Sequence, residues 1–153
     1  MKKIWIIHSS DYGNSEKVAN QIAEGLKDSF DISVGHIKET TPEDLAKEDI
    51  YGLIAAVRIF AFGSDKKIRN FLNNLNRVTK KQISKFAYFS THALKWKNFF
   101  IKGMKKTVSK LGCVEDVCTD ILEVRLEGPK GPAREGANEK INNYVLTLKE
   151  FMK

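Results

Sequence analysis

The sequence predicts an α/β protein whose parallel sheet is covered by helices on both faces. Short apolar segments alternate with helical segments along the whole chain, and parallel strands need such helical crossovers. The first of them, Ile4 to Ile7, is continuously apolar, as expected for a strand that is buried on both faces. The 153 residues contain no linker, repeat or low-complexity tract, so residues 1–153 are expected to form a single domain.

Five apolar segments are the expected strands. They share a length of about four to six residues and a high content of β-branched or aromatic side chains, which strands favour. They are residues 3–8, 32–37, 53–57, 86–89 and 121–126.

The segments between these strands have apolar residues at helical spacing. In residues 15–27 the apolar positions Val18, Ile22 and Leu26 fall on one face. Thr41 and Pro42 are typical of the start of a short helix. Ser64 is expected to cap the next helix and Gly112 to end the one after the fourth strand. The last helix is expected to bury Ile141, Val145, Leu148 and Met152.

The composition narrows the range of functions. No apolar run approaches the ~20 residues of a membrane span, and the apolar start is too short for a signal peptide. Cys113 and Cys118 have no second ligand pair nearby, so we expect reduced thiols in a cytoplasmic protein rather than a zinc site. The net charge of +7 comes from scattered lysines, which favours an acidic protein partner over nucleic acid.

The loop between the first strand and the first helix has the composition of an anion site. A loop that opens a helix directs several backbone N–H groups to one place, where the helix dipole favours negative charge. Ser10 and Ser15 add hydroxyl groups, Asn14 adds an amide, and Gly13 allows the backbone to bend towards an oxyanion. The loop is neither a Walker A motif nor a G-x-G-x-x-G turn.

These residues resemble the phosphate loop of the FMN-binding flavodoxins. Residues 8–19, His-Ser-Ser-Asp-Tyr-Gly-Asn-Ser-Glu-Lys-Val-Ala, are similar to that family's S/T-x-x-G-N-T followed by E-K-x-A, with Ser15 in place of the usual threonine. The run from Gly128 to Gly136 is similar to the G-P-x-x-E-G of several microbial relatives. The resemblance implies a flavodoxin-like, doubly wound five-stranded parallel sheet of order 2-1-3-4-5 with helices on both faces. It also implies that FMN is the cofactor and that its phosphate is bound by Ser10, Asp11, Tyr12, Gly13, Asn14 and Ser15.

The same resemblance implies that the loops after the third and fourth strands hold the flavin ring. The third-strand loop departs from the family's S-P-T pattern and is closer to the A-S-I-R-Y run of menaquinone-dependent protoporphyrinogen oxidases. Positive charge there, from Arg58 above all, would stabilise the reduced flavin. The candidates in the two loops are Val57, Arg58, Phe60, Ala61, Phe62, Thr91, His92 and Trp96.

Three functions remain open at this point. The first is an FMN electron carrier with a redox protein as its partner. The second is a small FMN-dependent oxidoreductase acting on a quinone or a protoporphyrinogen, although such an enzyme resembles a flavodoxin with a longer insertion after the fourth strand. The third is a binding module that has lost its FMN. No acid–base pair or nucleophile stands out, so no catalytic residue is expected, and the oligomeric state is left open.

Overall fold

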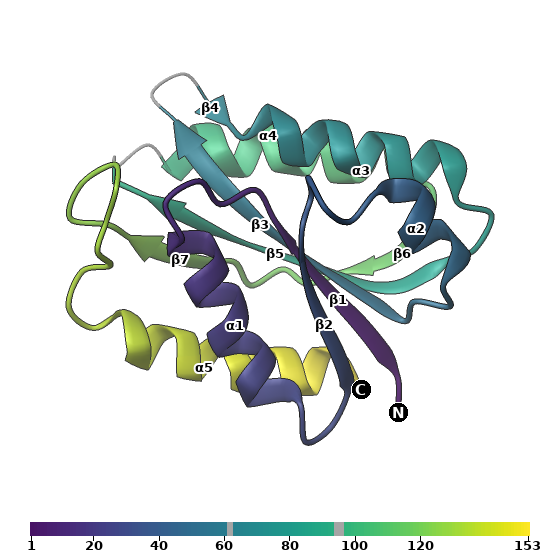
Figure 1. The fold of residues 1–153 in the computed structure, drawn as a ribbon, viewed down its shortest axis with the longest axis horizontal. Helices are drawn as coiled ribbons and strands as arrows, with labels where there is room; N and C mark the ends of the chain where they lie inside the picture. Colours follow the sequence, from purple (N-terminus) through teal and green to yellow (C-terminus); the bar gives the residue numbers. More distant parts are fainter. Residues whose placement is uncertain (61–62, 94–96) are drawn as a thin grey trace.

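The computed structural model describes residues 1–60, 63–93 and 97–153, with the backbone alone for residues 60, 63–64 and 97–100. Strands and helices alternate through most of this part of the chain (Figure 1). The strands are β1 (Lys3–His8), β2 (Asp31–His36), β3 (Gly52–Phe60), β4 (Gly63–Ser64), β5 (Ile83–His92), β6 (Val114–Val117) and β7 (Leu122–Arg125). The helices are α1 (Asn14–Leu26), α2 (Pro42–Lys47), α3 (Lys66–Val78), α4 (Lys97–Ser109) and α5 (Ala137–Phe151).

The main sheet is parallel and has the order β2-β1-β3-β5-β6. Strand β7 pairs with the second half of β5, beyond the end of β6, so β6 and β7 together take the place of one edge strand. The order 2-1-3-4-5 and the fold predicted from the sequence are therefore confirmed. The order reverses between β1 and β3, and ligands of doubly wound sheets bind outside the carboxyl ends of the strands at such a point.

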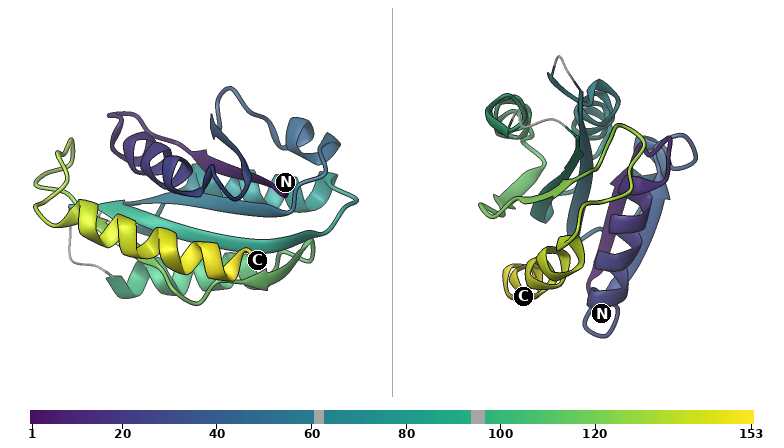
Figure 2. Two further views of the ribbon diagram at one scale, coloured as in Figure 1. Left: turned by 90° about the horizontal axis from the view of Figure 1, so that it is seen from below. Right: turned by 90° about the vertical axis from the view of Figure 1, so that its left-hand side faces the viewer.

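Helices cover both faces of the sheet. Helices α1 and α5 lie on one side and α3 and α4 on the other (Figure 2). Within β1, Ile4 and Ile6 belong to the core under α1 and α5, whereas Ile7 belongs to the core under α3 and α4. This division explains why a continuously apolar segment forms a strand: each face of β1 needs its own apolar side chains. The four apolar residues expected inside the last helix all lie in the first of these cores.

Some predicted boundaries were wrong. The expected fifth strand, residues 121–126, is β7, but the sequence did not predict β6, which pairs separately with the first half of β5. Asp65 rather than Ser64 caps α3, since its carboxylate accepts the backbone N–H of Lys67, whereas Ser64 pairs with Ile59. Helix α4 ends at Ser109, before Gly112, and Gly112 does not adopt the left-handed conformation of a glycine cap.

Candidate functional site

The loop between β1 and α1, residues 9–13, turns sharply into the helix at Gly13. Gly13 is the N-cap of α1 and has φ 86°, a left-handed conformation that residues with a side chain rarely adopt. Its carbonyl oxygen accepts the N–H of Lys17 at 2.9 Å, which completes the first helical turn. No side chain caps this helix by a hydrogen bond, so the first backbone N–H groups of α1 are free to face a ligand.

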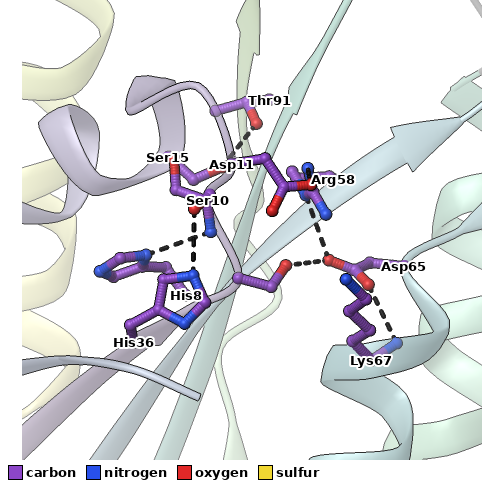
Figure 3. Close-up of polar contacts among 10 residues, drawn as sticks. His8, Ser10, Asp11, Ser15, His36, Arg58, Asp65, Lys67 and Thr91 are labelled. Atoms are coloured by element: carbon purple, nitrogen blue, oxygen red, sulfur yellow. Dashed lines mark hydrogen bonds and ion pairs between the residues drawn. The ribbon is translucent and has the colours of Figure 1, made fainter. Parts of the chain in front are cut away.

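Two histidines form hydrogen bonds with the backbone of Ser10 (Figure 3). The N–H of Ser10 donates to Nδ1 of His8 at 3.3 Å, and the carbonyl oxygen of Ser10 lies 3.0 Å from Nε2 of His36. The two imidazole rings meet edge to face, with centroids 5.0 Å apart. Burial and the neighbouring His36 lower the pKa of His8 below its ordinary value. Neither histidine was among the predicted site residues.

A buried hydroxyl pair joins the first helix to the sheet. Oγ of Ser15 lies 2.8 Å from Oγ1 of Thr91 at the end of β5, and the two side chains are 1% and 3% exposed. Either hydroxyl can be the donor in this contact. The hydroxyl that accepts keeps its own proton for a further acceptor, and the hydroxyl that donates keeps its lone pairs for a further donor. This contact fixes the start of α1 against the sheet.

Arg58 forms an ion-pair network with two carboxylates. Its Nη1 lies 2.9 Å from Oδ2 of Asp11 in the loop, and its Nε lies 3.5 Å from Oδ2 of the buried Asp65. Asp65 also accepts the hydroxyl of Ser9 and the N–H of Lys67. The hydrogen bond and the charge of the guanidinium lower the pKa of Asp11. Two carboxylates thus pair with Arg58, and its contribution to the charge around a flavin stays a prediction.

A cavity of about 590 Å³ lies at the carboxyl ends of the strands, between this loop and the ends of β3, β5 and β7. Its volume falls in the usual range for ligand pockets, roughly 300–1,000 Å³. Eight of the residues predicted for the site line it. They are Ser10, Asp11, Tyr12, Asn14, Ser15, Arg58, Thr91 and His92.

The remaining predicted residues either do not line the cavity or lie outside the described part of the chain. Gly13 shapes the loop but does not line the cavity, and Val57 is fully buried in the core under α3 and α4, so its side chain does not reach the site. Phe60 ends β3, and its side chain lies outside the described part of the chain. Ala61, Phe62 and Trp96 lie outside the described residues altogether.

The loop after β7 is a wall of the cavity that the sequence did not predict. Leu126 pairs with Ala133 across this loop, and the N–H of Glu127 donates to the carbonyl oxygen of Pro132 at 2.8 Å, so the loop is closed on itself. The additional lining residues are Ile59, Ala93, Leu126, Glu127, Gly128 and Pro129. The signal was available, because a Gly-Pro turn directly after the last strand must lie at the same edge as the other strand ends.

This wall is attached to the phosphate-loop side of the cavity. Nδ2 of Asn14 donates to the carbonyl oxygen of Lys130 at 3.0 Å. Gly131 has φ 86°, and a Cβ there would come within 2.4 Å of Oδ1 of Asn14, so only glycine permits this approach. The ammonium of Lys130 also lies 5.5 Å from the ring centroid of Tyr12, which is 59% exposed.

Comparison with known families identifies the chain. A family model described as a flavodoxin domain matches residues 5–118. The chain belongs to the flavodoxin family. The resemblance seen in the loop between β1 and α1 therefore extends over most of the chain. A comparison with curated protein sequences found no match.

Solved structures similar to this chain are flavodoxins and larger proteins that contain such a fold. The oxidised flavodoxin 1 of Bacillus cereus is 18% identical, with 98% of both chains covered and a TM-score of 0.73. A Fusobacterium nucleatum flavodoxin bound to flavin mononucleotide is 17% identical, with both chains fully covered and a TM-score of 0.68. The rubredoxin oxygen:oxidoreductase of Desulfovibrio gigas is 16% identical over 99% of this chain but only 36% of that protein, with a TM-score of 0.75. At these identities the likeness shows the fold.

Proposed function

We propose that this protein binds one FMN in the cavity at the carboxyl ends of the strands and carries electrons with it. The observation that carries the proposal is the position of the phosphate loop at one wall of a cavity of about 590 Å³, with the ends of β3, β5 and β7 as the other walls. The similar Fusobacterium nucleatum structure is titled as bound to flavin mononucleotide, which supports the choice of ligand.

The residues present fit the phosphate group of FMN. The uncapped N–H groups of α1, the hydroxyls of Ser10 and Ser15 and the amide of Asn14 are neutral donors at a helix N-terminus. The carboxylate of Asp11, which would repel a phosphate, is paired with Arg58. The loop therefore offers hydrogen bonds and a helix dipole to a dianion without an opposing free charge.

The strand ends would hold the flavin ring. Thr91, His92 and the Gly128–Pro129 turn are the described residues that would bound it, and Arg58 would present a neutralised guanidinium to its edge. FMN supplies the redox chemistry when bound, and the protein sets its potential through packing and hydrogen bonds.

Electron carriage is favoured over an enzyme by the shortness of the connection after β5. This connection is residues 93–96, between His92 and Lys97. An insertion of the length expected for an enzyme of the protoporphyrinogen oxidase type does not fit into it. No helix of the described residues is long and apolar enough to cross a membrane.

The partner proposed for this carrier is an acidic redox protein. The net charge of +7 favours association with negative surfaces, and long-range attraction accelerates encounter. A cytoplasmic location is part of the proposal and is supported by Cys113 and Cys118, which are buried free thiols.

The test is an absorbance scan of the purified protein, followed by addition of FMN if the protein is colourless. We expect bound-flavin bands and quenched flavin fluorescence. A protein that stays colourless and leaves the fluorescence of added FMN unchanged would contradict the proposal and favour a flavodoxin-shaped module without flavin.

A further inference from the structure

The histidine pair under the phosphate loop can be assigned a protonation state from its partners. Nδ1 of His8 lies 3.3 Å from the N–H of Ser10, so it must accept a hydrogen bond and carry no proton. Nδ1 of His36 lies 3.0 Å from the N–H of Lys38 and must also accept. Nε2 of His36 then carries the proton and donates it to the carbonyl oxygen of Ser10 at 3.0 Å.

Both polar groups of the Ser10 backbone are therefore held by side chains that must be neutral. Protonation of His8 would place an N–H donor against the N–H of Ser10, and protonation of His36 would do the same to the N–H of Lys38. Figure 3 shows both rings next to Ser10, with contacts to its backbone. Two imidazolium ions with centroids 5.0 Å apart would also repel each other.

We propose that His8 and His36 are positioning residues of the phosphate loop: as neutral rings they hold Ser10 in the form that binds the FMN phosphate, and protonation of His8 removes the acceptor of the Ser10 N–H and releases the loop. This inference rests on the proposed binding of FMN. Acidification then lowers the affinity for the phosphate group of FMN and leaves the contacts of the flavin ring unchanged.

The groups around His8 shift its pKa in opposite directions. Burial and His36 disfavour the charged ring, whereas Glu16 at the start of α1 and Glu39 after β2 favour it. His8 is 3% exposed, so little water surrounds its ring to stabilise a charge there.

The experiment compares FMN with riboflavin, which lacks the phosphate, by fluorescence titration between about pH 8 and about pH 5.5, on either side of the ordinary histidine pKa. We expect the FMN-to-riboflavin affinity ratio of the wild type to fall by up to about tenfold, with the affinity for riboflavin nearly constant. The phosphate also gains a proton near about pH 6, so a part of this fall belongs to the ligand.

The variants His8→Asn and His36→Gln separate the contribution of histidine protonation from that of the FMN phosphate. The amide oxygen of asparagine can replace Nδ1 of His8 as an acceptor, and the amide group of glutamine can replace Nε2 of His36 as a donor, but neither titrates. We expect tight FMN binding at about pH 8 in His8→Asn and a fall in the ratio several times smaller than in the wild type. Equal falls in wild type and His8→Asn would contradict the inference.

A measurement on the wild type keeps the test independent of the variants. Nitrogen NMR of the histidine rings at about pH 8 should show both rings with an unprotonated Nδ1 and a protonated Nε2. A protonated Nδ1 in either ring would overturn the inference whether or not FMN binds. Absence of FMN binding at about pH 8 together with the expected ring state would contradict the proposed function instead.

Discussion

The two sides of the cavity are built in different ways. The phosphate-loop side comes from one continuous segment, Ser10 to Ser15, which is fixed by contacts to β2, β3 and β5. The opposite side is assembled from the ends of three strands and contains Arg58, His92 and Pro129. The phosphate loop therefore depends on many specific polar contacts, whereas the other side depends on how the strand ends are arranged.

The largest effect is expected from Asp65, which connects the two sides. Asp65→Ala removes the cap of α3, the acceptor of the Ser9 hydroxyl and one of the carboxylates that pair with Arg58. We expect a loss of about 2–4 kcal/mol in the free energy of unfolding, measured by urea denaturation. Asp65→Asn keeps an oxygen at the cap and should lose distinctly less. Equal losses in the two variants would contradict a role for the charge of Asp65.

Two glycines with the same backbone conformation separate stability from binding. Gly13 and Gly136 have φ 86° and 87°, each is the N-cap of a helix, and a Cβ on either would meet no atom within 4 Å. Alanine at either position should therefore lower the free energy of unfolding by about 1–2 kcal/mol through backbone strain alone.

The affinity for FMN distinguishes Gly13→Ala from Gly136→Ala. Gly13→Ala should also weaken FMN binding by up to about tenfold, because a free loop that relaxes about 1.4 kcal/mol of strain must restore it in order to bind. Gly136→Ala should leave FMN binding unchanged. Equal FMN affinities of the two variants, measured by fluorescence titration, would exclude a role for the turn at Gly13 in binding.

The hydroxyl pair of Ser15 and Thr91 is expected to have a smaller effect. Thr91→Val leaves the buried hydroxyl of Ser15 without this partner and should lower the free energy of unfolding by about 1–2 kcal/mol. A double-mutant cycle with Ser15→Ala isolates the contact, and its coupling energy should be about 1 kcal/mol. Additive losses would show that the two hydroxyls do not stabilise each other.

The smallest effect is the contribution of His8 to the pH dependence of stability. Its pKa is lowered in the folded protein, so the unfolded chain binds more protons as the pH falls. This contribution is complete above about pH 6.5 and is lost as the pH falls through the lowered value. Urea denaturation at several pH values should show a steeper acid loss in the wild type than in His8→Asn, and parallel curves would contradict it.

The difference between the two sides also explains what the sequence could predict. The phosphate loop is local: Gly13, Asn14 and Ser15 lie next to one another in the chain, and their combination indicates an anion site. The pattern of apolar residues likewise predicted most strands and helices, whereas the strand order was implied by the resemblance to the flavodoxins. The ion pairs of Arg58 could not be predicted, because they join residues 47 and 7 positions away in the chain.

The rest of the site could not be predicted because it depends on how far the strands extend, and local sequence patterns do not determine strand length. Strand β5 continues to His92, three residues beyond its expected end at Phe89, because its partner β7 pairs with it as far as Arg125. That pairing brings Leu126 and the following turn to the cavity. The role of His8 and His36 was missed for a related reason: they are neighbours only across the pairing of β1 with β2.

The most direct test of this account is an amide NMR titration of the isotope-labelled, flavin-free protein with FMN and with riboflavin. We expect residues 10–15 to shift strongly with FMN and weakly with riboflavin, and residues 126–128 to shift with both ligands. Equal shifts of residues 10–15 with the two ligands would contradict the claim that the loop between β1 and α1 binds the phosphate of FMN.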